Sequence, residues 1–162
     1  MSAEPRPRSP GVFFPPPFLY LLGLGIAWVL ETKVSRIRLV GGSASTAPLE
    51  TAGVAIMLAG FVLMFWGLLT FARARTGIIP MQPATQIVTH GPYRFSRNPM
   101  YSGMALAYLG GSLIVNSGWA LLVFPLVILG IYHLVIKREE RYLHSAFPAE
   151  YGNYKKSVRR WL

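Results

Sequence analysis

Four apolar stretches, none of which contains a charged residue, constrain the fold of this 162-residue chain more than any other feature. A transmembrane helix needs about 20 apolar residues to cross about 30 Å of hydrocarbon. The second stretch has this length by itself, the first can extend back through Val12–Pro17, and the fourth continues to Lys137. We therefore expect an all-α integral membrane bundle of four transmembrane helices, forming one domain over residues 1–162. The four stretches are Phe18–Leu30, Thr51–Ala72, Met100–Val115 and Trp119–Ile136.

Two features predict which of these helices touch. Only Asn116-Ser117-Gly118 separates the third stretch from the fourth, which predicts a tight hairpin of antiparallel neighbours. Small residues also recur along two of the helices, and such stripes allow close helix packing in lipid. The stripe on the third helix is equally compatible with the floor of a cleft. The stripes are Gly53, Gly60 and Gly67 on the second helix and Gly103, Ala107 and Gly111 on the third.

Composition excludes several classes of site. The chain has no cysteine, which excludes disulfides, thiolate zinc sites and cysteine nucleophiles. It also has no aspartate, so the metal and phosphate motifs that depend on aspartate are absent. His133, Glu140 and His144 are spaced too widely for a typical zinc motif. We therefore expect no bound metal.

The distribution of basic residues predicts the orientation in the membrane. The side that holds both termini carries most of the sixteen lysines and arginines, whereas the first loop on the opposite side has only Lys33, Arg36 and Arg38. The positive-inside bias then places both termini in the cytoplasm. The net charge of +10 follows from this topology and from contact with anionic membrane lipid, without a nucleic acid partner. The basic residues of that side are Arg6, Arg8, Arg73, Arg75, Arg94, Arg97 and those between Lys137 and Arg160.

The proline-rich residues 1–17 are expected to form a flexible or extended arm. A cleaved secretory signal is the alternative, because Arg6 and Arg8 precede an apolar run. The Pro15-Pro16-Pro17 break and the charged residues after Leu30 favour a retained span.

The first polar segment with candidate functional groups is His90–Gly103. Asn98 is a good N-cap and Pro99 suits the first helical position, so a helix is expected to begin here with its positive dipole end toward the cytoplasm. Arg94 and Arg97 add positive charge, and His90 adds an imidazole, a type of side chain that can change its charge near neutral pH. The segment therefore suits an anionic group. The alternative is a capped helix whose arginines contact lipid phosphates.

The second candidate segment is Lys137–Tyr154, which contains half of the acidic residues, namely Glu139, Glu140 and Glu150. The alternative interpretation is a solvated helix end with weak exposed ion pairs. Apolar and aromatic residues recur at helical spacing farther along, with lysines and arginines between them. This pattern predicts a C-terminal amphipathic helix in the membrane interface. The apolar positions are Leu143, Phe147, Tyr151, Tyr154, Val158 and Trp161.

Together these segments resemble the isoprenylcysteine carboxyl methyltransferase family and its phospholipid N-methyltransferase relatives. The similarity lies in G-P-Y…R-x-P-x-Y-x-G at Gly91–Gly103, E-E-x-x-L at Glu139–Leu143 and F-x-x-E-Y-x-x-Y at Phe147–Tyr154. Two positions differ from the family pattern: Asn98 replaces the usual histidine, and Pro148 replaces the usual glycine.

The resemblance implies an S-adenosylmethionine-dependent methyltransferase, with residues 85–162 as the cofactor-binding core. Glu139 and Glu140 would bind ribose hydroxyls or favour the sulfonium, while Arg97, His90 and the helix start would bind the cofactor carboxylate. Methyl transfer needs positioning more than a covalent nucleophile. The cofactor-binding residues implied are His90, Gly91, Tyr93, Arg97, Asn98, Pro99, Tyr101, Gly103, Glu139 and Glu140, and the catalytic residues implied are Glu139, Glu140, Glu150 and Arg159.

The methyl acceptor is expected to be lipophilic, a small molecule or a lipidated group that enters laterally between helices. A prenylated cysteine carboxylate, a phospholipid amine, an isoprenoid and a small thiol all fit. A carboxylate acceptor needs no general base, whereas an amine or thiol would use Glu150, His90 or His144. Arg159 or Arg160 would orient an anionic acceptor.

Two other functions are compatible with the sequence: an NADPH-dependent reductase of the sterol-reductase type, and a non-enzymatic four-helix membrane protein. The oligomeric state is left open.

Overall fold

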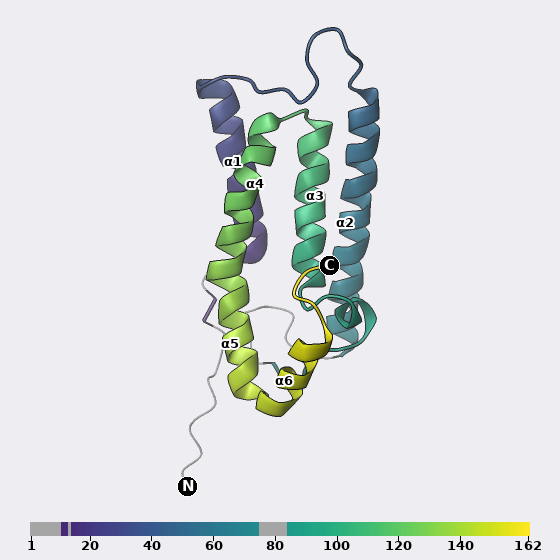
Figure 1. Ribbon diagram of the computed structural model, residues 1–162, viewed down its shortest axis with the longest axis vertical. Helices are drawn as coiled ribbons and strands as arrows, with labels where there is room; N and C mark the ends of the chain where they lie inside the picture. Colours follow the sequence, from purple (N-terminus) through teal and green to yellow (C-terminus); the bar gives the residue numbers. More distant parts are fainter. Residues whose placement is uncertain (1–10, 13, 75–83) are drawn as a thin grey trace.

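The computed structural model describes residues 11, 12, 14–74 and 84–162, and in this part of the chain every named element is helical. The four long helices run up and down in alternation (Figure 1), and a turn of π-helix joins α4 to α5 without a break. The elements are α1 (Pro16–Lys33), α2 (Ala47–Arg73), the 3-10 turn η1 (Gly91–Arg94), α3 (Pro99–Ile114), α4 (Gly118–Ile131), the π-helical turn η2 (Tyr132–Ile136), α5 (Lys137–Ala146) and α6 (Pro148–Ser157).

Two helices in the described part of the chain are long and apolar enough to cross a membrane. They are α2 and the continuous helix Gly118–Ala146, both with a mean hydropathy of 2.3 over their most apolar window. Large apolar side chains face outward on both, including Val62 at 68% and Leu126 at 67% exposed, as does Trp28 of α1 at 66%. α1 ends in the charged Glu31 and Lys33, and α3 has 16 residues. A membrane protein is thus indicated by α2 and by the helix that contains α4.

α3 packs mainly along α2, through the backbone of small residues. A Cβ atom at Gly60 would lie 2.5 Å from the carbonyl oxygen of Gly103, and one at Gly53 would lie 2.7 Å from that of Gly110. A side chain at Gly53 or Gly60 would overlap the α3 backbone, so the predicted stripe on α2 serves helix packing. The stripe on α3 was predicted to include Gly111, but Gly111 has nothing within 4 Å of its Cβ position and Gly110 makes the contact. Seven residues return nearly to the same helix face, whereas eight overshoot it.

The predicted hairpin between the third and fourth helices is confirmed. α3 ends at Ile114 and α4 begins at Gly118, where the Ser117 side chain accepts a hydrogen bond from the backbone of Ala120 at 3.1 Å. Asn116 has a positive φ of 52°. Its side-chain oxygen accepts the Leu39 and Val40 amide hydrogens at 2.8 and 3.0 Å, which ties the α1–α2 loop to this end of the bundle.

The buried core lies between α1, α3 and the helix α4–η2–α5. Ile131, Val135 and Ile136 are completely buried, which brings the core down to the point where the charged α5 begins. The Tyr20 hydroxyl of α1 donates to the carbonyl of Tyr101 in α3 at 2.9 Å. The first turn of α3 is therefore held by α1 as well as by α2.

The C-terminal region does not form one continuous amphipathic helix through Trp161. The helix breaks at Phe147, because a residue before proline is disfavoured in helical conformation and Pro148 follows. Tyr151 and Tyr154 of α6 are buried against the rest of the protein. The chain leaves α6 in an extended conformation at Val158. We refer to residues Val158–Leu162 as the C-terminal strap.

Several positions used to predict the arm and the orientation lie outside the described residues, namely Arg6, Arg8, Arg75 and most of the arm 1–17. The first described residue lies near α5, because the Arg138 guanidinium donates to the Gly11 carbonyl at 2.9 Å. The two described ends of the chain are thus at the same end of the bundle (Figure 1).

Candidate functional site

The two polar segments singled out in the sequence meet at the end of the bundle where α3 begins and α5 continues from α4. The Tyr101 hydroxyl donates to a carboxylate oxygen of Glu139 at 2.6 Å. The Arg97 guanidinium contacts Glu140 at 3.0 Å between Nη1 and Oε1. Consecutive glutamates of α5 are therefore bound by different residues of the segment that starts α3.

The η1 turn places this segment by its backbone. Gly91 has a positive φ of 61°, and a Cβ there would lie 2.7 Å from the Thr70 hydroxyl of α2. Gly91 thus has a structural reason to be glycine. The neighbouring Tyr93 is buried, its ring packs edge-on against Phe71, and its carbonyl accepts the Tyr154 hydroxyl at 2.7 Å. The turn is fixed on one side by α2 and on the other by α6.

Asn98 and Pro99 occupy the predicted first positions of α3, but the Asn98 side chain does not cap the helix. Its Nδ2 donates instead to the carbonyl oxygen of Arg160 at 3.0 Å. Ser96 is completely buried and its hydroxyl donates to the same carbonyl at 3.2 Å. The Arg97 amide donates to the Arg159 carbonyl at 2.8 Å. The segment before α3 therefore binds the C-terminal strap through both backbone and side chains.

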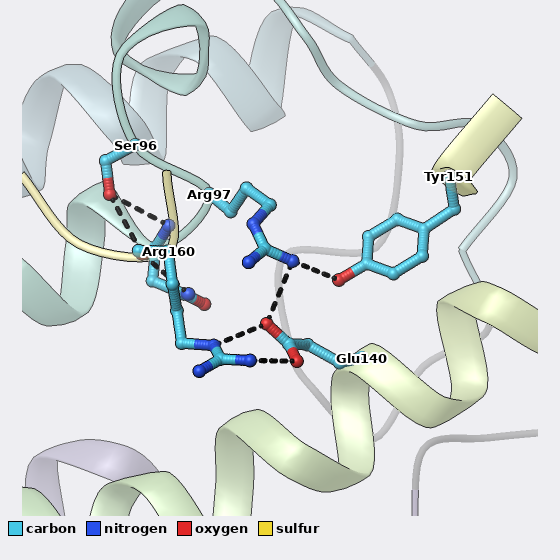
Figure 2. A network of polar contacts seen from close by, with 6 residues as sticks. Ser96, Arg97, Glu140, Tyr151 and Arg160 are labelled. Atoms are coloured by element: carbon cyan, nitrogen blue, oxygen red, sulfur yellow. Dashed lines mark hydrogen bonds and ion pairs between the residues drawn. The ribbon is translucent and has the colours of Figure 1, made fainter. Parts of the chain in front are cut away.

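Glu140 is the centre of an ion cluster with Arg97 and Arg160 (Figure 2). Arg160 binds Glu140 through two bonds, Nε to Oε1 at 2.9 Å and Nη2 to Oε2 at 3.0 Å. Arg97 also donates to the Tyr151 hydroxyl at 3.3 Å. The Arg97 and Glu140 side chains are 8% and 14% exposed, whereas that of Arg160 is 32% exposed. One side of the cluster is thus open to a ligand.

The titration of nearby groups follows from these contacts. Its hydrogen bond to Glu140 raises the pKa of Arg160 further above its usual value. Burial raises the pKa of Tyr151 and, more strongly, those of Tyr93 and Tyr154. Over the physiological pH range Arg160 is therefore charged and these tyrosines are neutral. The Tyr154 hydroxyl donates to the Tyr93 carbonyl, whereas the Tyr151 hydroxyl accepts from Arg97.

Glu139 and Glu140 have different environments. Glu140 has both carboxylate oxygens bound by guanidinium groups, whereas the described contacts of the Glu139 carboxylate are limited to the Tyr101 hydroxyl. Three buried polar atoms near the site have no hydrogen-bond partner among the described residues: the hydroxyls of Tyr93 and Ser102 and the Nε of Arg97. An unsatisfied buried polar atom is unfavourable, so these atoms are available to hydrogen-bond a bound molecule.

Other predicted residues lie away from this cluster. The side chains of His90, Glu150 and Arg159 are exposed, although the Arg159 backbone takes part through its carbonyl. Gly103 faces α2, where its Cβ position lies 2.6 Å from the Gly60 carbonyl oxygen, so it contributes helix packing. His133 and His144 are exposed, and the described residues contain no group of three side chains able to hold a metal ion.

Three further residues take part in the site although no sequence feature marked them as site residues, namely Ser96, Tyr132 and Tyr151. Tyr132 lies in the π-helical turn, and its ring is 5.1 Å from the Arg160 guanidinium. A π-helical turn has no clear sequence signature, so this contact could not be predicted. Tyr151 was assigned to an apolar stripe by its spacing, which does not distinguish a lipid-facing residue from a buried one. Ser96 is one polar residue in a polar loop and offered no separate signal.

Comparison with known proteins gives consistent matches. The sequence model described as "Phospholipid methyltransferase" matches residues 49–150. A probable protein-S-isoprenylcysteine O-methyltransferase from Oryza sativa subsp. indica is 29% identical over 112 residues, which cover 68% of this chain and 59% of the rice protein. Protein-S-isoprenylcysteine O-methyltransferase A from Arabidopsis thaliana is 26% identical over 108 residues, covering 65% of this chain and 55% of the plant protein.

A shorter match extends to fungi. Protein-S-isoprenylcysteine O-methyltransferase from Schizosaccharomyces pombe is 35% identical over 72 residues, which cover 44% of this chain and 30% of the yeast protein. In each case the matched region spans less than two thirds of the relative's length. No solved structure matches this chain.

Proposed function

Because this chain belongs to the phospholipid methyltransferase family, we propose that it is an integral membrane enzyme that transfers the methyl group of S-adenosylmethionine to a lipophilic acceptor. The observation that carries the proposal is the convergence of the two candidate segments. Tyr101 binds Glu139 and Arg97 binds Glu140 across 38 and 43 positions of sequence, which encloses polar groups of both signs at one end of an apolar bundle.

The residues present fit the proposed cofactor. S-adenosylmethionine carries a sulfonium, a carboxylate, an amine and ribose hydroxyls, and when bound it supplies the electrophilic methyl group. Glu139 has carboxylate lone pairs beyond its bond to Tyr101, which suit hydroxyls or positive charge. The unpartnered Nε of Arg97 suits the cofactor carboxylate. Tyr93 offers a further buried hydroxyl. We place the cofactor-binding core within residues 85–162.

The contribution of the protein to the reaction is positioning. Tyr101 holds Glu139, and Glu140 and Tyr151 hold Arg97, so the charged groups are fixed before any ligand arrives. Two of the three candidate bases, His90 and Glu150, are exposed and have no described contact with the cluster. The third, His144, is also exposed, and its ring lies edge-on to Tyr151 with the centroids 6.5 Å apart. A carboxylate acceptor needs no base, so a lipophilic carboxylate such as a prenylated cysteine fits the described residues better than an amine or thiol.

We further propose that all four long helices span the membrane, with both termini on the cytoplasmic side. α1 and α3 lie beside the two candidate spans and are long enough for a thin or locally deformed bilayer. The cluster then lies at the cytoplasmic interface, with α5 and α6 beside it. The exposed lysines of α6 would face anionic lipid headgroups.

Ligand-dependent stability tests the proposal. The purified protein in detergent is heated with S-adenosylhomocysteine, with NADPH and without ligand. A ligand at 100 times its dissociation constant adds about 2.7 kcal/mol to the free energy of unfolding. We expect S-adenosylhomocysteine to raise the melting temperature, and Glu139→Gln to reduce that rise. Stabilisation by NADPH alone would favour a reductase, and no response to either would favour a non-enzymatic membrane protein.

A further inference from the structure

The C-terminal strap returns to the segment before α3 and is fixed there at two consecutive carbonyl groups. The Arg159 carbonyl accepts the Arg97 amide at 2.8 Å, and the Arg160 carbonyl accepts bonds from Ser96 and Asn98 at 3.2 and 3.0 Å. These contacts determine the position of the Arg160 Cα. They also leave the Arg159 side chain exposed and direct the Arg160 side chain to Glu140 (Figure 2).

The resulting cluster carries a formal charge of +1, since one carboxylate lies between two guanidinium groups. Without Glu140, Arg97 and Arg160 would repel each other, so the carboxylate holds them side by side. Bonds to Glu140 occupy Nε and Nη2 of Arg160 and Nη1 of Arg97. Arg97 Nε is buried and has no described partner. The cluster thus has positive charge and an unused buried donor, which together suit an anion.

The surroundings do not neutralise this charge. The Tyr132 ring lies under Arg160, with its centroid 5.1 Å from the guanidinium carbon, and Tyr151 accepts a bond from Arg97. Lys137 adds a second cation over the Tyr132 ring at 5.6 Å. The neighbouring carboxylate, Glu139, adds a formal charge of −1 and is bound by the neutral Tyr101, so the formal charges of Lys137 and Glu139 offset each other. Arg160 is also the most exposed member of the cluster, so a ligand can reach it from solvent.

We propose that the C-terminal strap, through Arg160, completes a carboxylate-binding subsite in which Glu140 positions the guanidinium groups of Arg97 and Arg160 for the ligand. The inference rests on the proposed methyltransferase function. It adds a residue that lies beyond positions 49–150, the region that matches the family. It also makes Glu140 a positioning residue, which acts through the two arginines, whereas Glu139 is proposed to contact the cofactor itself. The carboxylate comes either from the methionine part of the cofactor or from the acceptor.

Binding measurements with two nucleosides test whether the carboxylate belongs to the cofactor. S-adenosylhomocysteine contains the amino-acid carboxylate, whereas 5′-methylthioadenosine lacks it. Arg160→Gln is compared with wild type and with Arg141→Gln, which removes one exposed charge from α5. If the cofactor carboxylate is the ligand, we expect Arg160→Gln to weaken S-adenosylhomocysteine binding about tenfold or more, as for the loss of one charged hydrogen bond. Binding of 5′-methylthioadenosine should change less than about twofold under the same reasoning.

Enzyme kinetics test whether the carboxylate belongs to the methyl acceptor. If the acceptor carboxylate is the ligand, Arg160→Gln leaves S-adenosylhomocysteine binding unchanged and raises the KM for a prenylated cysteine about tenfold. The methyl ester of that acceptor, which has no free carboxylate, should then inhibit wild type and variant equally. Either result supports the subsite. If Arg160→Gln changes neither quantity, or if Arg159→Gln has the larger effect, the inference is overturned while the proposed function stands.

Two further measurements keep the result interpretable. Arg160→Lys retains the positive charge without the bidentate geometry, so it should fold like wild type and recover part of the binding. The double variant Glu140→Gln/Arg160→Gln should bind no more weakly than Glu140→Gln alone, because the two residues act as one unit. Additive losses would contradict the role given to Glu140. Failure of the wild-type protein itself to bind S-adenosylhomocysteine would overturn the proposed function, and with it this inference.

Discussion

At the scale of single residues, adjacent side chains have separate roles that sequence position alone does not reveal. Glu139 and Glu140 are consecutive in α5, yet one is bound by a tyrosine and the other by two arginines. Arg159 and Arg160 are equally similar in sequence, but only Arg160 reaches the cluster with its side chain. Glu139 and Glu140 differ by about 100° around the helix axis. Arg159 and Arg160 lie in the extended strap, where successive side chains point to opposite sides. The sequence could therefore locate the site to within one residue and no better.

Removing the central carboxylate should destabilise the protein. Glu140→Gln leaves two nearby guanidinium groups without a counter-ion, one of them largely buried. Because Arg160 is partly exposed to solvent, we expect a loss of about 1–3 kcal/mol, below the 3–5 kcal/mol for a fully buried pair. Glu150→Gln, at an exposed position, should change stability by less than about 0.5 kcal/mol. Urea or thermal unfolding in detergent measures both, and equal effects would contradict the arrangement in Figure 2.

The buried tyrosines predict how stability depends on pH. Burial raises the pKa of Tyr154 above its usual value of 10.0, so the folded protein retains this proton at pH values where the unfolded chain loses it. The folded state then binds more protons above about pH 10, and stability falls as the pH rises from there. Tyr154→Phe should make this fall shallower, while at pH 7 it costs about 1 kcal/mol from the lost bond to the Tyr93 carbonyl. Melting temperatures between pH 7 and 11 test the prediction, and an unchanged slope would contradict it.

At the scale of helices, the apolar stretches predicted each long helix, and the short polar turn predicted the hairpin between α3 and α4. They did not predict the π-helical turn, which has no clear sequence signature. The break at Phe147 was not predicted either, although Pro148 is a local signal for it. Apolar and aromatic residues do recur at helical spacing in the C-terminal region. Tyr151 and Tyr154 among them are buried against η1 and α5 and do not face lipid. A stripe of aromatic residues is compatible with lipid, with a protein core or with both. Only the tertiary contacts of Tyr151 and Tyr154 separate these possibilities.

The α2–α3 contact makes a sharp prediction for glycine substitutions. Gly60→Ala would place a methyl group 2.5 Å from a backbone carbonyl, so the helices must separate, at a cost of about 1–3 kcal/mol. Gly111→Ala meets nothing within 4 Å and should instead stabilise the helix by up to about 1 kcal/mol. Thermal unfolding of the two variants in the same detergent compares them directly. Equal destabilisation would show that Gly111, as the sequence suggested, belongs to the contact.

At the scale of the whole molecule, the fold separates two ends with different chemistry. One end holds the cluster, α6 and the strap, and the other holds the α1–α2 loop fixed by Asn116 (Figure 1). The uneven distribution of lysines and arginines between the loops predicted that the two ends differ. The family resemblance implied that the two candidate segments meet. The sequence did not predict that the strap closes the site, since that depends on contacts such as Ser96 to Arg160, which are 64 positions apart.

The absence of cysteine provides a direct test of orientation. Single cysteines at Ser43 in the α1–α2 loop and at Asn153 in α6 are both at exposed positions. In intact cells a membrane-impermeant maleimide should label Ser43→Cys, whereas Asn153→Cys should react only after the membrane is permeabilised. The opposite pattern would invert the proposed topology. Labelling of both positions in intact cells would contradict a chain that crosses the membrane between them.

The return of the strap to the start of α3 makes the cluster depend on three separate parts of the chain. Arg97, Glu140 and Arg160 meet only when both α5 and the strap reach the segment before α3. The glycine contact between α2 and α3 involves none of these residues. A truncated or partly unfolded protein can therefore retain a helical bundle in the lipid and still be unable to hold a charged ligand. Loss of activity and loss of membrane insertion are separable defects in this architecture.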